Sequence, residues 1–261
     1  MKNLTYLLIL LFAFNSCDFI KQMTEKKQEK AVEENAIASK PKIKNGVKKY
    51  YFDTGELKSI VNYKNNKKVG ISETFYKSGE KQYDIPYVDG MKHGVVKWYY
   101  KDGKVYRETD YIKGKKSGYQ RKFWENGKLK SEAFYKDNLA SIGLKEISKT
   151  DKKKSTPTIE VQKINLLKTK QEYVLKFKLS TGRKKVKFYQ AKLIDGKFFP
   201  ENGGKGIKEL KTVAGVGELR IPVGKGFNID KDINIVAVES TAYQNKRIIS
   251  KKVHVSVQNP L

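Results

Sequence analysis

GVVKWYYKDGKVYRETDYIKGKKS, residues 94–117, is the third of four copies of a 24-residue unit. The copies begin at Gly46, Gly70, Gly94 and Gly118, and no insertion or deletion interrupts their spacing over residues 46–141. A second glycine recurs nine residues into each copy, at Gly55, Gly79, Gly103 and Gly127. A fixed period of this length is typical of a repeat protein, in which each copy stacks on the next.

Each copy predicts a β-hairpin. A short strand ends in an aromatic pair, and a turn such as Lys101-Asp102-Gly103 follows, where glycine supplies a positive φ without steric cost. The next strand alternates with period two, so that in the first copy one face carries Leu57, Ser59, Val61 and Tyr63. We therefore expect eight strands in an antiparallel meander, with equivalent side chains stacked in rows.

The aromatic pairs predict two rows on opposite faces of this meander. One row contains Tyr51, Phe75, Tyr99 and Phe123, and the other contains Phe52, Tyr76, Tyr100 and Trp124. A single-layered sheet can bury only one face. We expect the first row to form the core together with the tyrosine that ends each second strand, Tyr63 in the first copy. The second row is then the predicted partner-binding surface.

Copies such as residues 94–104 resemble the bacterial MORN-variant repeat of YwqK-like proteins, and the resemblance covers residues 46–141. It implies a sheet of stacked hairpins in which none of the recurring positions is catalytic. Some members of that family are labelled antitoxins or immunity proteins. The resemblance thus also implies an alternative function, the neutralisation of a partner toxin.

The N-terminus predicts export. An apolar run from Leu4 to Phe14 follows Lys2 and is too short to span a bilayer, so residues 1–16 are expected to be a signal peptide. Ser16 followed by the lone Cys17 resembles the lipobox of bacterial lipoproteins, which implies cleavage before Cys17 and its lipidation. An ordinary signal peptide with an incidental cysteine is the alternative. Residues 17–45 are rich in lysine, glutamate and alanine, and predict a flexible tether.

The repeat pattern stops near residue 141. Residues 142–156 predict a second linker, and residues 157–261 contain period-two runs such as 173–179 and 233–238, separated by glycine-rich turns. Six or seven strands without helical periodicity predict a β-sandwich, with an immunoglobulin- or fibronectin-like arrangement as the first expectation. The fold class is therefore all-β.

The sequence contains no recognisable catalytic or metal-binding motif. The two histidines, His93 and His254, stand apart from any spaced cluster of carboxylates, so we expect no metal site. Neither a nucleophile elbow nor a phosphate-binding loop occurs. We therefore expect no enzyme activity, no catalytic residue and no cofactor.

The charge is strongly basic, with a formal net value of +27, but lysine rather than arginine supplies it. Phosphate recognition usually depends on the arginine fork, and an exported protein does not meet nucleic acid. We therefore expect no nucleic-acid partner. The prediction is a non-enzymatic lipoprotein, anchored at Cys17 in the outer membrane or another periplasm-facing membrane, that binds a protein or glycan in the cell envelope.

Overall fold

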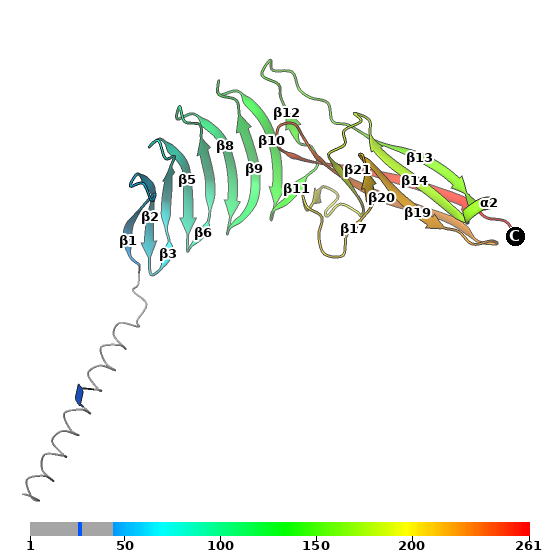
Figure 1. Cartoon of the computed structure of the whole chain (residues 1–261), viewed down its shortest axis with the longest axis horizontal. Coiled ribbons are helices and arrows are strands. Elements are labelled where there is room, and N and C mark those ends of the chain that lie inside the picture. Colours follow the sequence, from blue (N-terminus) through cyan, green and yellow to red (C-terminus); the bar gives the residue numbers. More distant parts are fainter. Residues whose placement is uncertain (1–25, 28–43) are drawn as a thin grey trace, which may run out of the picture. The chain divides into compact units, whose positions relative to one another are not determined.

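The computed structural model describes residues 26–27 and 44–261 (Figure 1). The predicted signal peptide 1–16, Cys17 and most of the predicted tether 17–45 lie outside these residues. Within the described part of the chain, no helix is both long and apolar enough to cross a membrane. Residues 45–261 form one compact unit, so the repeats and the following segments pack into a single body.

The repeats form the predicted antiparallel meander, in which each strand pairs with the next. Its eight long strands are β1 (Gly46–Tyr51), β2 (Leu57–Lys64), β4 (Gly70–Phe75), β5 (Lys81–Val88), β7 (Gly94–Tyr99), β8 (Val105–Ile112), β9 (Lys115–Phe123) and β10 (Leu129–Lys136). The sheet is extended by short strands: β3 (Lys67–Lys68), β6 (Met91–Lys92), β11 (Leu139–Ser141), β12 (Lys145–Glu146) and β16 (Phe198–Phe199). The all-β meander predicted from the 24-residue period is confirmed.

The recurring turn glycines hold the left-handed backbone that the hairpins need. Gly55, Gly79, Gly103 and Gly127 have φ values of +97°, +99°, +83° and +79°. The amide of Gly103 donates to the carbonyl of Tyr100 at 3.1 Å, and the other three glycines make the equivalent bond. A Cβ atom at any of the four would meet no atom within 4 Å. The requirement for glycine here comes from the backbone conformation and not from crowding.

Replacing Gly103 by valine should lower the free energy of unfolding by about 1–2 kcal/mol, because a β-branched residue is strained at positive φ. Gly103→Asn should cost less, since asparagine tolerates the left-handed region. The neighbouring Lys101→Ala, at an exposed position, should cost under about 0.5 kcal/mol. Urea unfolding followed by tryptophan fluorescence measures this, because both tryptophans lie in the repeats. Equal costs for valine and asparagine would contradict the strain argument.

The first aromatic row does not form the buried core of the meander, whereas the face that carries Val61 and Tyr63 does hold buried residues. Tyr51 is 57% exposed, and Phe75, Tyr99 and Phe123 are only half-buried, so the expectation that this row forms the core is wrong. The buried positions lie within strands that have a neighbouring strand on each side. They are Val61, Ser72, Val96, Thr109, Gln120, Lys122, Ser131, Ala133 and Tyr135. Of the tyrosines expected to share the core, Tyr135 is buried, whereas Tyr63 is half-buried.

A β-bulge lies opposite the aromatic pair in three of the repeats. The pairing register shifts between Tyr50 and Tyr51, between Thr74 and Phe75, and between Trp98 and Tyr99. Each shift falls directly before the aromatic pair. The extra residue, Lys58, Gln82 or Tyr106, is in the second strand of each hairpin, so alternation is interrupted there and not in the strand that carries the aromatic pair.

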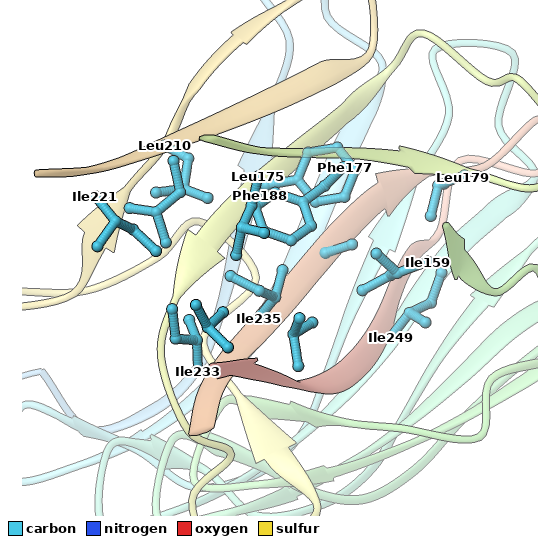
Figure 2. Packing of buried hydrophobic residues seen from close by; sticks show 14 of the residues in the cluster. Ile159, Leu175, Phe177, Leu179, Phe188, Leu210, Ile221, Ile233, Ile235 and Ile249 are labelled. Carbon is cyan, nitrogen blue, oxygen red and sulfur yellow. The ribbon is translucent and has the colours of Figure 1, made fainter. Parts of the chain in front are cut away.

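Residues 157–261 form two antiparallel sheets, as the sandwich prediction requires. One sheet has the order β13 (Ile159–Leu166), β14 (Glu172–Leu179), β19 (Val216–Pro222) and β18 (Lys211–Val213). The other has the order β17 (Lys208–Glu209), β15 (Val186–Gln190), β20 (Asn228–Ser240) and β21 (Lys246–Gln258). The single turn α2 (Leu167–Lys170) joins β13 to β14. Figure 2 shows the core that both sheets contribute to, with Phe177, Phe188 and Ile235 fully buried.

The predicted linker 142–156 packs against the rest of the protein. Leu144 and Glu146 are 5% and 2% exposed, and β12 pairs with β10. Beside them, Tyr135 and Ala140 of the last repeat share a hydrophobic cluster with Tyr189, Phe199, Val236 and Ile248. A terminal repeat has no following copy to cover its end, and here the second part of the chain covers it.

A buried polar network strengthens this junction. Glu146 accepts hydrogen bonds from the Thr241 hydroxyl at 2.6 Å and from the Asn245 amide at 2.8 Å. It also pairs with Arg247 at 2.7 Å, and Arg247 pairs with Glu239 at 2.9 Å. The predicted linker and the β20–β21 hairpin are thus joined by charge-assisted hydrogen bonds.

Candidate functional site

The predicted partner-binding row connects the repeats to one another. Tyr76, Tyr100 and Trp124 are half-buried, and each follows directly after a strand. The Tyr76 hydroxyl donates to the carbonyl of Tyr99 at 2.8 Å, and the Tyr100 hydroxyl donates to that of Phe123 at 2.9 Å. The Trp124 indole donates to the carbonyl of Ile147 at 3.2 Å. Phe52 has the same place in the first repeat but carries no donor, and Lys58 lies 5.6 Å from the centre of its ring.

This ladder was missed by the sequence reasoning, although the sequence held a signal for it. Three of the four equivalent positions carry an aromatic ring with a polar tip, and the donor and acceptor residues are 23 positions apart each time. A half-buried polar tip requires a partner. A recurring tyrosine or tryptophan therefore indicates a recurring acceptor in the next repeat.

Tyr100→Phe should lower the free energy of unfolding by about 0.5–1.5 kcal/mol, because it removes one intramolecular hydrogen bond and leaves the ring in place. Tyr51→Phe is the matched control at an exposed position and should be nearly neutral. Urea unfolding of the two variants measures the difference. If both behave like the wild type, the hydroxyl ladder contributes nothing to stability.

A groove lies where the third and fourth repeats meet the segment that follows them. Its volume is about 600 Å³. The turns of the two repeats, strands β8 and β10, and the segment after β12 supply its lining, which consists of Tyr100, Lys104, Tyr106, Trp124, Glu125, Asn126, Lys130 and Lys149. Two residues of the predicted partner-binding row, Tyr100 and Trp124, are therefore part of the lining, whereas Phe52 and Tyr76 are not.

Edge-to-face contacts hold the aromatic rings of the groove. The ring centre of Tyr106 lies 5.1 Å from that of Tyr100 and 4.7 Å from that of Trp98, and both contacts have T-shaped geometry. Trp124 makes a similar contact, at 5.2 Å, with Tyr243 in the turn between β20 and β21. The sandwich thus completes the aromatic cluster at the end of the repeats, and such pairs fix ring orientation beyond what burial alone provides.

Three lysines surround these rings. The Lys130 ammonium lies 4.3 Å from the ring centre of Trp124, 5.4 Å from that of Tyr243 and 6.0 Å from that of Tyr106. Lys149 lies 5.5 Å from the ring of Trp124. Lys154 lies 3.9 Å from the ring of Tyr243. Rings attract cations through their electron-rich faces, so the aromatic cluster holds these ammonium groups in place.

Three of the lysines at the groove have no salt-bridge partner among the described residues. Within residues 44–261, Lys130, Lys149 and Lys154 form no salt bridge with a carboxylate, whereas Lys104 pairs with Asp102 at 2.9 Å. Burial, and secondly the nearby charge of Lys149, hold the pKa of Lys130 below its ordinary value. The groove therefore combines planar aromatic surface with the positive charge of these lysines.

The two histidines lie apart from the lining. His93 is exposed, and its amide donates to the carbonyl of Pro86. His254 is exposed on β21, and its ring nitrogens lie 3.2 Å from Asp232 and 3.3 Å from Asp230. Among the residues that the structure describes, no group of three or more histidine, cysteine or acidic side chains is arranged to hold a metal ion.

A family model, the MORN repeat variant, matches residues 44–65, 92–113 and 116–137. These segments correspond to the first, third and fourth repeats. The second repeat is outside the match, although its strands β4 and β5 pair as their equivalents do. No curated protein and no solved structure gives a significant match to the chain. The match supports the repeat class and does not extend to the sandwich.

Proposed function

We propose that this chain is a YwqK-like lipoprotein of the cell envelope, anchored through Cys17, that binds a protein or glycan without catalysing a reaction. The groove carries the proposal. It offers three aromatic rings, Tyr100, Tyr106 and Trp124, beside lysines that have no carboxylate partner in the described part of the chain. Rigid aromatic surface and charges without a salt-bridge partner are features by which binding sites hold and orient a ligand.

The lining favours binding over catalysis. Its single carboxylate, Glu125, belongs to an exposed turn residue. A pair of facing carboxylates, the usual arrangement in glycoside hydrolysis, is not part of this lining. The rings and lysines instead provide contact area and charge, which suits a scaffold.

Lipid anchoring is tested by Cys17→Ser. We expect the wild type to incorporate a palmitate analogue and to fractionate with membranes, and the variant to lose both properties, since no other cysteine is present. Ser16→Ala keeps a small residue before Cys17 and is the matched control, which should remain labelled. A wild type that takes up no label would show that the lipobox interpretation is wrong.

Binding in the envelope is tested with the purified chain and isolated envelope material. We expect the wild type to be retained and Trp124→Ala to be retained several-fold less, because this change removes the central ring of the groove. Protease treatment of the envelope abolishes retention if the partner is a protein, and periodate treatment abolishes it if the partner is a glycan. Equal retention of the wild type and Trp124→Ala would show that the groove is not the binding site for the envelope material.

A further inference from the structure

We propose that the groove binds an acidic saccharide, meaning a sugar ring that carries a carboxylate or a phosphate group. The inference rests on the proposed function and names the class of ligand. The rings of Tyr100, Tyr106 and Trp124 would contact the apolar face of the sugar, and Lys130 and Lys149 would pair with its anionic group.

The charge at the groove indicates an anionic ligand. Lys130 and Lys149 lie over the same Trp124 ring, and Lys154 lies over the adjacent ring of Tyr243. Like charges held this close repel one another, and no carboxylate of the described residues forms a salt bridge with them, although the charge of Glu146 offsets part of that of Lys130. A bound anion would relieve this repulsion through charge-assisted hydrogen bonds. The net charge of +27 would also raise the rate at which anions reach the site.

The lining also argues against a cationic ligand. Here Lys130 already lies within 6.0 Å of the ring centres of Tyr106, Trp124 and Tyr243. A cation would have to displace this lysine and approach Lys149 and Lys154 as well. Repulsion by these three ammonium groups therefore disfavours a cationic ligand.

The shape and chemistry of the lining favour a sugar over an acidic peptide. Not one of the eight lining residues is aliphatic, and three of them are aromatic. A sugar ring presents a flat apolar face to the aromatic rings and hydroxyl groups at its edges. The side chains of Lys104, Glu125 and Asn126 can donate to or accept from those hydroxyls. A volume of about 600 Å³ is sufficient for a short oligosaccharide.

Calorimetric titration of the full chain in detergent tests the inference. The probes are a galacturonic acid trimer, the neutral galactose trimer, glucose 6-phosphate and pentaglutamate. We expect the acidic trimer or the sugar phosphate to bind at least about tenfold more tightly than the neutral trimer, because only these carry an anion for the lysines. The stronger of the two identifies the anionic group. Their binding should weaken as salt is added.

Matched variants locate the binding. Lys149→Gln changes an exposed residue of the connecting segment, and Lys130→Gln/Lys149→Gln removes both cations over Trp124. We expect affinity for the acidic ligand to fall several-fold in the first and at least about tenfold in the second. Lys211→Gln/Lys225→Gln removes the same charge from exposed positions outside the lining and should change affinity less than about twofold.

Three results would overturn the inference. Equal binding of acidic and neutral trimers would remove the anionic requirement. Pentaglutamate binding as tightly as the acidic trimer would identify a site for acidic peptides. Absence of binding by both the trimer and the sugar phosphate would rule out the ligand class, while retention by envelope material would still decide the proposed function separately.

Discussion

Replacing Arg247 by methionine should lower the free energy of unfolding by about 3–5 kcal/mol, the cost of breaking a buried ion pair from one side. Arg247 is 5% exposed, and its two terminal nitrogens pair with Glu239 at 2.9 Å and with Glu146 at 2.7 Å. Both carboxylates are almost fully buried. Methionine has a similar length but no charge, so the variant leaves two anions in a site that water barely reaches.

The two carboxylates differ in the partners that they keep once Arg247 is replaced. Glu239 keeps Arg183, at 3.2 Å, whereas Glu146 keeps only the neutral donors Thr241 and Asn245. Most of the cost should therefore come from Glu146, and the second change in Arg247→Met/Glu146→Gln should recover part of the lost stability. Urea unfolding of the two variants measures the recovery.

Arg220→Met is the matched control for this experiment. Arg220 also pairs with two carboxylates, Glu172 and Glu218, both at 2.7 Å, but its side chain is 50% exposed. Solvent screens such a pair, so its loss should cost under about 1 kcal/mol. If Arg247→Met cost no more than Arg220→Met, burial would not be what makes the junction strong.

The repeat fold could be predicted because its determinants are local. Glycine at a positive φ and an alternating strand recur every 24 residues, and a hairpin needs little else. Alternation also indicated which side chains share a face within one strand. It could not say which face is covered, because that depends on contacts between copies and with the second part of the chain.

The groove could be predicted only in part, because contacts between distant segments build it. Tyr100 and Trp124 were recognised from the repeat pattern, but Tyr243 lies 119 residues after Trp124 (243 − 124). Lys149 and Lys154 belong to a lysine-rich stretch whose composition indicated a linker. Glu146 was equally inconspicuous, since one glutamate among lysines gives no sign that it will pair with a buried arginine 101 residues away.

The titration of Lys122 should raise the free energy of unfolding by about 2 kcal/mol as the pH rises from 7 to 9.5. Its side chain is 3% exposed, and burial, followed by the charges of Arg107 and Lys130, lowers its pKa to about 8. In the unfolded chain the pKa returns to the ordinary lysine value near 10.5. Between these two values the unfolded chain binds a proton that the folded chain does not, so stability increases with pH.

The contacts of Lys122 survive this deprotonation. Its amino group donates to the carbonyls of Tyr243 and Gln244 at 3.1 and 3.0 Å, and a neutral amine retains two N–H donors for these bonds. Above about pH 10 the trend should reverse. Burial in the folded protein raises the pKa of Tyr99 to about 12, so the unfolded chain ionises first and is favoured as the pH rises further.

Urea unfolding at several pH values between 7 and 9.5, followed by the fluorescence of Trp98 and Trp124, measures the predicted slope. Lys122→Met removes the titrating group and should flatten the slope by most of those 2 kcal/mol. Lys128→Gln, an exposed lysine of the same repeat, controls for the loss of one charge and should keep the slope. A wild type and a Lys122→Met variant with the same slope would show that the buried ammonium does not carry this pH dependence.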